Sequence, residues 1–541
     1  MFAIAVLGSF LLYLVIGAVM GRRVKDRSDF YVAGRSAPTL LVAGTLVASF
    51  LSTVSFMGEL GFSYDGFPVA MLILVALNIS GYVLGVLGFG RYLRRSEALT
   101  VPEFFGRRFD SVGVQVVAGL MVVVGIGLYL VAVTQGLALV VAQLLDWPDW
   151  LTVVIVWLAY TVFTLMSGSK GILVNDTIMF FVFMLAGAVG MSWVIGEAGG
   201  PSAAFDKMTQ IGSKPDALTW HGVTGDGAYM GSPAEVLVWS LTLGIVWMTV
   251  VAVSPWQSSR YLMAKNEHVC LRSGFIAMGA VGALYVFMTF GGFAINIFNP
   301  AIEPSEVAFI WAAQNVMPEA LGVIAVTGIV AAGLSSAAAF LSLIGFSAAH
   351  DILQWLPRMQ RRSASEAEAL RLSKQVMLAI GVVVLLVTIW APPAVLTIGY
   401  FAATLFAAAW GPVAIWSVHG KRLSARGAMS GMIAGFVGVG VLNGLVEFAG
   451  LSLPIWADPV LIGVALSVLA TVIGDLGQQP TEAATTFRES ILQTPAEDRS
   501  PARLRGTWVT AAGTAAVFVV VLVAMIVWYA MPMADLASTG G

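Results

Sequence analysis

The sequence predicts an all-α membrane protein with about fourteen transmembrane helices, and two observations lead to this fold class. Hydrophobic residues make up 58% of the 541-residue chain and charged residues only 11%, whereas an ordinary soluble chain carries about 25% charged residues. The chain also contains fourteen apolar stretches of suitable length. A helix rises about 1.5 Å per residue, so about 20 residues cross a hydrocarbon core of about 30 Å.

The fourteen predicted spans share an apolar interior with few charges. In order they are 2–20, 38–60, 66–90, 112–145, 149–167, 174–197, 235–258, 273–298, 318–349, 375–391, 393–418, 427–447, 456–474 and 509–531. The connecting segments are short except for 198–234, 350–374 and 475–508, and none is long enough to form a separate domain. The last of these is mixed in charge and is expected to be a solvated cytoplasmic linker to the final helix.

Basic residues indicate how the spans are oriented. If the connections alternate between the two sides, one side receives 26 of the 28 Lys and Arg residues, and the other only Lys207 and Lys214. The positive-inside rule assigns the basic side to the cytoplasm. The chain is therefore expected to cross the plasma (inner) membrane many times, with both termini extracytoplasmic.

Composition argues against several other functions. The net charge of −2 gives no support for a nucleic-acid partner, and the single Cys270 cannot form an internal disulfide. Four scattered histidines show no metal-binding spacing, and no cluster of acids and histidines lies at membrane depth. No catalytic residues, and so no enzyme, are expected, and nothing indicates a required protein partner.

Three spans carry polar or small residues that could open a helix onto a cavity, because in hydrocarbon every backbone amide must find a partner. The second has Gly44, Ser49, Ser52, Thr53, Ser55 and Gly58; the seventh ends in Ser254-Pro255-Trp256-Gln257; the ninth contains Gly328, Gly333, Ser335 and Ser336. Close helix packing is the alternative for any one span. The second and seventh spans, however, lie five apart and so run in opposite directions, which indicates two inverted five-helix repeats with a binding site between them.

Three motifs resemble the sodium:solute symporter family. Asp29-Phe30-Tyr31-Val32-Ala33-Gly34-Arg35 is similar to the family's segment after the first span, Ala48–Gly61 to its broken helix, and Arg260–Asn266 to the segment after its seventh span. The resemblance covers about residues 25–425. It implies a leucine-transporter-type core at 38–420, made of repeats at about 38–197 and 235–420. Residues 1–37 and 421–541 would then be peripheral.

The resemblance also implies that Na⁺ is the coupling ion and that it has a site between the second and ninth spans. Matched residue by residue, the ligands are the carbonyls of Ala48, Leu51 and Ala332 and the hydroxyls of Ser335 and Ser336. Residues i, i+3 and i+4 share one helix face, so the last three groups converge. A hard cation prefers oxygen ligands of this kind.

Five residues are candidates to contact the solute. They are Ser52, Ser55, Gln135, Trp256 and Gln257, each with a packing role as the alternative. The small polar inventory favours a compact solute such as a monocarboxylate or an amino acid. A sugar or polyol symporter, or a sensor or channel on the same scaffold, remains an alternative.

Two carboxyl groups lie within or beside the spans. Glu59 is expected to reach water or lipid headgroups from the end of the second span, with pairing to a cationic substrate or a proton as the alternative. Asp176 is expected to cap the start of the sixth span. Some relatives place an acid at the position of Asp176 for a second sodium, together with two hydroxyls. Ala338 and Ala339 stand at those hydroxyl positions, so a single sodium is expected.

Overall fold

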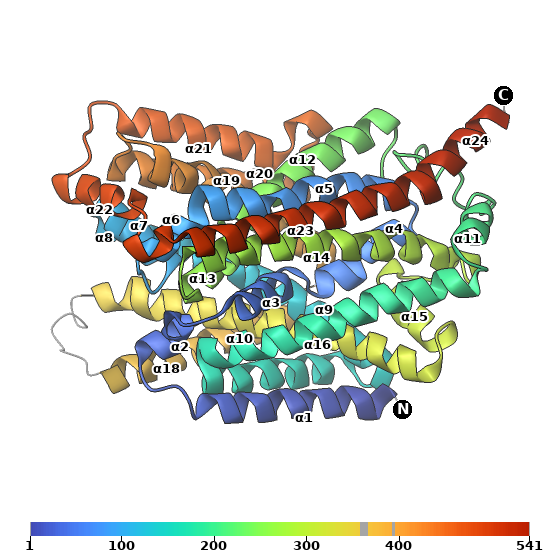
Figure 1. The fold of residues 1–541 in the computed structure, drawn as a ribbon, viewed down its shortest axis with the longest axis horizontal. Coiled ribbons are helices and arrows are strands. Elements are labelled where there is room, and N and C mark those ends of the chain that lie inside the picture. Colours follow the sequence, from blue (N-terminus) through green and yellow to red (C-terminus); the bar gives the residue numbers. More distant parts are fainter. Residues whose placement is uncertain (1, 357–365, 392–394, 540–541) are drawn as a thin grey trace.

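The computed structural model describes residues 2–356, 366–391 and 395–539, and the described chain is helical, without a named strand. The long helices run side by side along one direction, and both termini lie at the same end of the bundle (Figure 1). The bounds of the broken, interrupted and central helices and of the last ones are given with each of them below. The other helices of the described chain are α1 (Phe2–Gly21), α2 (Arg27–Val32), α5 (Pro68–Gly85), α6 (Arg91–Arg95), α7 (Val101–Phe109), α8 (Val112–Met121), α9 (Gly127–Leu145), α11 (Pro201–Met208), α14 (Glu267–Ala294), α15 (Ala308–Asn315), α18 (Glu366–Trp390), α19 (Val395–His419), α20 (Ala425–Ala449) and α21 (Pro459–Asp475).

The number of spans agrees with the expected fourteen. Within the described residues, twelve helices are long and apolar enough to cross a membrane, and one bent pair makes a thirteenth span. One of the twelve, α10 (Asp149–Glu197), has 49 residues and contains a sharp change of direction at Gly168, whose φ is 51° and ψ −156°. Because only glycine adopts such a backbone readily, α10 is two spans joined at this turn. These two correspond to the predicted spans 149–167 and 174–197.

The second span is broken, as its sequence predicts. The helix α3 (Thr39–Phe50) ends before Leu51, which is extended with φ −70° and ψ 117°. The chain continues as a π-helical segment, η2 (Val54–Glu59), and then as α4 (Leu60–Tyr64), at an angle of 57° to α3. The break leaves the last carbonyl groups of α3 without helical partners.

The seventh span is interrupted at Ser254, between α12 (Pro233–Val253) and α13 (Pro255–Met263). Ser254 is extended, with φ −59° and ψ 151°. Pro255 has no amide hydrogen, so it fits the first position of α13 but could not continue α12. Interruptions therefore occur in both the second and the seventh spans.

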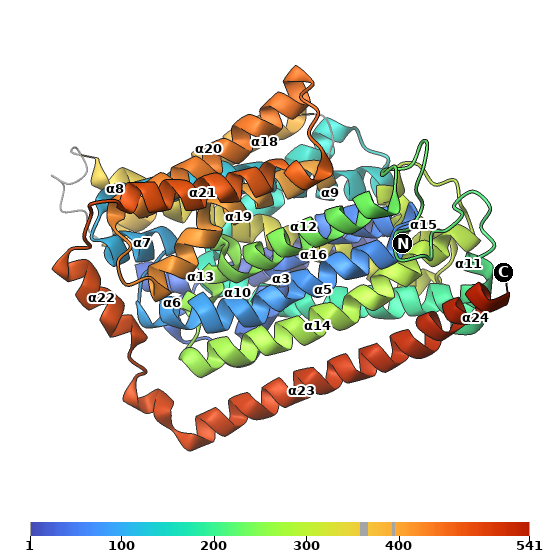
Figure 2. The same cartoon turned by 90° about the horizontal axis from the view of Figure 1, so that it is seen from above.

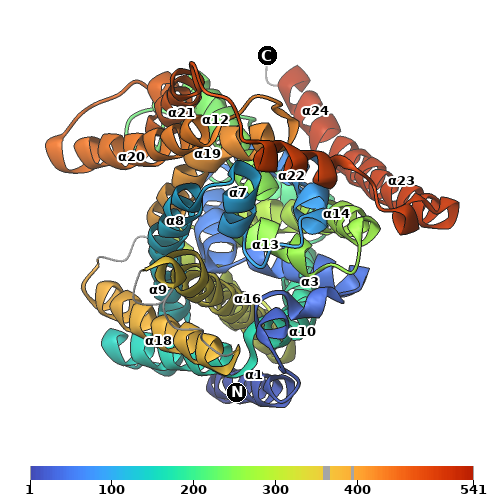
Figure 3. The same ribbon diagram turned by 90° about the vertical axis from the view of Figure 1, so that its left-hand side faces the viewer.

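The expectation of an opening in the ninth span is wrong. The helix α16 (Glu319–Phe346) continues without a break past Gly328, Gly333 and both serines, and it then widens into a π-helical segment, η7 (Ser347–Ile352). Every residue of its most apolar stretch is buried. In the end-on view α16 lies near the middle of the bundle, so it is a central helix that other helices surround (Figure 3).

The C-terminal helices cover the outside of the bundle. Figure 2 shows α20 and α21 along one edge and α23 (Pro501–Met525) along the opposite edge, where it leads through η11 (Ile526–Ala530) into α24 (Met531–Thr539). Residues 475–508 are more ordered than a solvated linker. They contain α22 (Glu482–Leu492), whose Arg488 donates from Nε to the carbonyl of Val418 at 2.9 Å.

Candidate functional site

The broken end of α3 meets the central helix α16 through two serine hydroxyls. Oγ of Ser336 lies 3.2 Å from the carbonyl oxygen of Ala48 and 3.3 Å from that of Leu51. Oγ of Ser335 lies 3.5 Å from the same Ala48 oxygen. These four residues are fully buried. Two hydroxyl oxygens and two freed carbonyl oxygens therefore converge in a region shielded from water, and such oxygens suit a hard cation.

The fifth expected ligand, Ala332, lies on the same face of α16, one turn before the two serines. It is also fully buried. The structure thus brings Ala48, Leu51, Ser335 and Ser336 of the expected sodium site together, with Ala332 one turn away on α16. Their role as ligands stays a prediction.

Asp176 lies beside this crossing, and the expectation that it caps a helix is wrong. It lies inside α10, which has already resumed after Gly168, and it is fully buried. Its two carboxyl oxygens accept hydrogen bonds from Thr45, at 2.5 Å, and from Ser335, at 2.7 Å. A carboxylate near the converging oxygens makes the position still more favourable for a cation.

Four of the five candidate solute residues line the two helix breaks. Ser52 is buried at the break in the second span, where its Oγ accepts the amide of Val54 at 3.2 Å. Oγ of Ser55 lies 3.1 Å from the hydroxyl oxygen of Tyr285. Gln257, just after the break in the seventh span, donates from Nε2 to Oγ of Ser49 at 3.4 Å. The amide of Gln257 therefore links the two broken spans.

Trp256 and Gln135 have different surroundings. The indole ring of Trp256 is 1% exposed and lies between three rings, with centroid distances of 5.4 Å to Tyr129, 5.9 Å to Phe340 and 5.5 Å to Phe406. Gln135 instead donates from Nε2 to the carbonyl of Ala391 at the end of α18, at 3.2 Å.

Sequence reasoning missed a group of side chains around Glu59. The expectation that Glu59 reaches water or headgroups is wrong, because the residue is only 3% exposed. Its Oε2 accepts a hydrogen bond from Tyr285 of α14, and its Oε1 accepts one from Tyr400 of α19 at 3.2 Å. The only sequence signal was the carboxylate itself, since tyrosines on the eighth and eleventh spans look like ordinary membrane aromatics.

The model of the sodium:solute symporter family matches residues 30–435. The chain belongs to the sodium:solute symporter family. It is therefore a multi-pass membrane transporter, and its coupling ion is sodium.

Individual relatives of this symporter agree with the family assignment. The uncharacterized symporter YwcA of Bacillus subtilis (strain 168) is 24% identical over 520 residues, which cover 88% of this chain and 94% of that protein. The structure is similar to that of a Na⁺-coupled sialic acid symporter in a substrate-bound outward-open state, with a TM-score of 0.72, 20% identity, and coverage of 88% of this chain and 98% of the other. It also resembles Mhp1, a nucleobase-cation-symport-1 family transporter in a closed conformation, with a TM-score of 0.51, 14% identity, and coverage of 85% and 98%. The expected leucine-transporter-type fold is confirmed.

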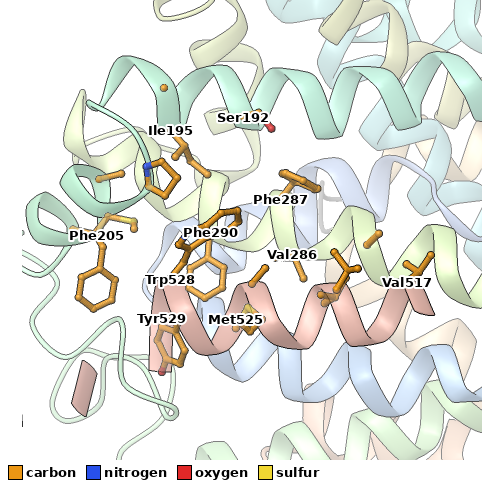
Figure 4. A pocket seen from close by; sticks show the side chains of 18 of the residues that line it. Ser192, Ile195, Phe205, Val286, Phe287, Phe290, Val517, Met525, Trp528 and Tyr529 are labelled. Atoms are coloured by element: carbon orange, nitrogen blue, oxygen red, sulfur yellow. The ribbon is translucent and has the colours of Figure 1, made fainter. Parts of the chain in front are cut away.

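A cavity of about 680 Å³ in this symporter lies away from both helix breaks, between α10, α14 and α23 (Figure 4). Apolar side chains such as Phe287, Phe290 and Trp528 dominate its wall. A polar solute would lose its hydrogen bonds to water there without replacement. The cavity is therefore not the solute site.

A cluster of polar groups closes the bundle at the end opposite the termini. Nε2 of His350, in η7, lies 2.9 Å from Oε2 of Glu103 in α7, and its Nδ1 lies 2.8 Å from Arg27. Burial on its own raises the pKa of Glu103. The hydrogen bond and charge of His350, the Leu99 amide and Arg107 outweigh burial and lower that pKa to about 2. No group of three or more metal-ligating side chains occurs among the described residues, and His350 joins Glu103 and Arg27 through its two ring nitrogens.

Proposed function

We propose that this symporter takes up a compact organic solute by alternating access, with sodium bound where α3 meets α16. The proposed ligands are the carbonyls of Ala48, Leu51 and Ala332 and the hydroxyls of Ser335 and Ser336. One observation carries the proposal. The Ser336 hydroxyl lies within 3.3 Å of two carbonyls that the helix break has freed, so a cation at this point replaces weak contacts with direct coordination.

Sodium binding would change the conformational equilibrium because its ligands come from two different helices. The broken helix α3 and the central helix α16 are both held by the ion, so it favours the arrangement in which they are close. Inward movement of one charge at a membrane potential of 100 mV supplies about 2.3 kcal/mol, before any concentration gradient is counted. Uptake of the solute against its gradient would draw on this energy.

The proposed solute site lies between the breaks in the second and seventh spans. Ser52 and Ser55 would supply polar contacts, Trp256 an aromatic surface, and Gln257 a hydrogen bond near the solute. Gln135 remains a weaker candidate, because its amide is engaged at the end of α18. A monocarboxylate, an amino acid or a similarly compact solute fits this small set of polar groups.

We also propose the division of the chain and its orientation. Residues 38–420 would form the transporting core, with repeats at about 38–197 and 235–420, and residues 1–37 and 421–541 would be peripheral. The described basic connections, among them α2, α6, α7 and α22, lie at the end of the bundle opposite the termini (Figure 1). By the positive-inside rule this end would face the cytoplasm of a plasma (inner) membrane.

The direct test is uptake by the full chain reconstituted into liposomes. A panel of radiolabelled small acids, amino acids and sugars would be offered with an inward sodium gradient, or with potassium in its place. Sodium-driven accumulation of at least one compact solute, abolished by a sodium ionophore, is the expected result. Equal uptake with either cation would contradict the proposal.

A further inference from the structure

The carboxyl group of Glu59 is a buried ionisable group next to the proposed solute residue Ser55. It lies in η2, one turn beyond Ser55, and both of its oxygens accept phenol hydroxyls, from Tyr285 and Tyr400. The Tyr285 hydroxyl also lies 3.1 Å from Oγ of Ser55. Two donors, one on each oxygen, stabilise the ionised form of a carboxyl group. The contacts therefore hold a carboxylate in a fixed position close to a candidate solute residue.

This carboxylate has no positive partner in the described part of the protein. Six ion pairs occur there, and none includes Glu59. A charge buried away from water is strongly unfavourable unless an opposite charge joins it. Arg260 of α13 is also buried, and the charge of Asp176 acts on it without a close ion pair among the described residues, so it is a separate buried cation on the sodium side of the break. A positive group that stabilises the ionised form of Glu59 would therefore have to come from outside the described chain.

Aromatic rings extend from Glu59 to the proposed solute contact Trp256. The ring of Tyr400 lies 5.3 Å from that of Trp247, which lies 6.4 Å from Tyr129, and Tyr129 lies 5.4 Å from Trp256. The faces of such rings attract cations, and organic ammonium groups are recognised in this way. These rings touch one another, so a solute would enter by separating them.

The charges in this region discriminate between the solutes that the proposed function allows. A monocarboxylate would approach the carboxylate of Glu59 and would find no Lys, Arg or His among the residues of this cluster. An ammonium group would find an opposite charge and aromatic faces. The difference in binding free energy between an ammonium group and a carboxylate is large here, because electrostatic interactions are strong in a region that excludes water.

Building on the proposed function, we propose that Glu59 binds an ammonium group of the transported solute, which is then a cationic or zwitterionic amine. Tyr285 and Tyr400 are positioning residues, because they hold the two carboxylate oxygens. Sodium and the ammonium group bind on opposite sides of the break in the second span, at Ala48–Leu51 and at Ser55–Glu59. The break thus separates two positive charges that would repel each other.

The test uses matched pairs of solutes in which a carbon replaces the charged nitrogen. Glycine betaine is paired with 3,3-dimethylbutanoate, L-alanine with 2-methylpropanoate, and L-proline with cyclopentanecarboxylate. Radiolabelled sodium binding to the purified full chain is measured with each compound, followed by sodium-driven uptake into liposomes. A solute that binds together with sodium raises sodium affinity by linkage. At least one amine is expected to exceed its carbon analogue by about tenfold or more in both measurements.

Two variants test whether Glu59 and its tyrosine partners cause the preference for amines. In Glu59→Gln, the amine and its carbon analogue should have about equal effects on sodium affinity and about equal uptake, a ratio of about one. Sodium binding should persist in this variant, and its persistence also shows that the variant is folded. Tyr400→Phe keeps the ring but removes one hydroxyl, and should reduce the ratio only in part.

The inference and the proposed function fail in different ways. Loss of saturable sodium binding in the wild type would contradict the proposed function, and this inference with it. Sodium binding that no amine strengthens, analogues as effective as amines, or an unchanged ratio in Glu59→Gln would overturn the inference alone. If Glu59→Gln altered only the pH dependence of uptake, Glu59 would carry a proton, and the inference would also be overturned.

Discussion

At the scale of single residues, two neighbouring serines have different surroundings. Among the described residues the Ser336 hydroxyl has the two carbonyls at the break as its hydrogen-bond partners, whereas Ser335 also donates to Asp176. A hydroxyl has one proton, so Ser335 cannot donate to Asp176 and Ala48 together. When sodium binds, the Ser335 hydroxyl can keep donating its hydrogen bond to Asp176 while the lone pairs of its oxygen coordinate the ion. The pair is therefore suited to bind a cation.

Replacing these serines tests the sodium site. Ser336→Ala and Ser335→Ala each remove one proposed ligand, and alanine keeps the helix intact. Loss of a hydrogen bond to a charged partner costs about 1.5–3 kcal/mol, and loss of a sodium ligand should be comparable. The half-saturating sodium concentration, measured by uptake, should therefore rise at least about tenfold.

The control for these variants is Ser342→Ala, on the same helix. The Ser342 hydroxyl is buried but bonds to Ala339 within α16. Its removal should leave the sodium dependence unchanged. Stable Ser335→Ala and Ser336→Ala proteins with the sodium dependence of the wild type would show that the ion binds elsewhere.

Trp256→Ala tests the proposed solute contact. An aromatic interaction is worth about 0.5–1.5 kcal/mol beyond burial, so the half-saturating solute concentration should rise several-fold to about tenfold. The sodium affinity should change less. Trp410→Ala is the matched control, because Trp410 is also a buried tryptophan, with its ring 5.1 Å from Phe105. Equal effects of the two variants on solute affinity would make Trp256 a packing residue.

At the scale of the element, the sequence predicted breaks in two spans correctly and in a third wrongly. Small residues in a membrane helix either open it or let a neighbour approach, and α16 shows the second case. A β-carbon added at Gly328 would lie 2.5 Å from that of Ala186 in α10, and one at Gly333 would lie 2.9 Å from a carbon of Thr53. Sequence alone does not reveal which neighbour lies opposite a glycine.

The same limit explains what was missed at the solute site. The sequence shows that a carboxyl group, Glu59, lies within the second span. Its environment is made by Tyr285 and Tyr400, which are more than 220 residues away along the sequence. No local pattern links these three residues. Conversely, Ser335 and Ser336 could be located because their neighbours on one helix face follow from helix geometry, with the family resemblance supplying the partner helix.

The contact between α7 and η7 should make stability depend on pH. The pKa of Glu103 falls from an ordinary value of 4.5 to about 2 in the folded protein. A depressed pKa contributes stability that is present above the unfolded pKa and is lost as pH falls through the folded pKa. Glu103→Gln should therefore lower the unfolding temperature of the purified protein at neutral pH, and this deficit should shrink between about pH 5 and pH 2.

Glu97→Gln is the control for this experiment. Its side chain is 70% exposed, and its nearest ion-pair partner, Arg94, is 3.9 Å away. Exposed pairs contribute little, so this variant should unfold like the wild type throughout. If the unfolding temperature of Glu103→Gln stayed below that of the wild type by the same amount at every pH, the ionisation of Glu103 would not contribute to the stability of the folded protein.

At the scale of the whole molecule, the bundle has two chemically different ends. Lys207 and Lys214 lie in the segment that includes α11, at the end that holds both termini (Figure 1). Lys214 donates to the carbonyl of Tyr64 at 2.7 Å, and burial lowers its pKa to about 8 although Asp65 opposes the shift. One of the two basic residues at this end is therefore held against the outer part of the broken span.

The orientation of these ends can be measured with single cysteines in intact cells. Cys270 is fully buried and should not react, so the natural chain is a suitable background. Thr209→Cys and Arg499→Cys place exposed thiols at opposite ends of the bundle. If the basic end faces the cytoplasm, a membrane-impermeant maleimide should label Thr209→Cys at once and Arg499→Cys only after the membrane is permeabilised. The reverse pattern would invert the topology, and with it the direction in which sodium drives the solute.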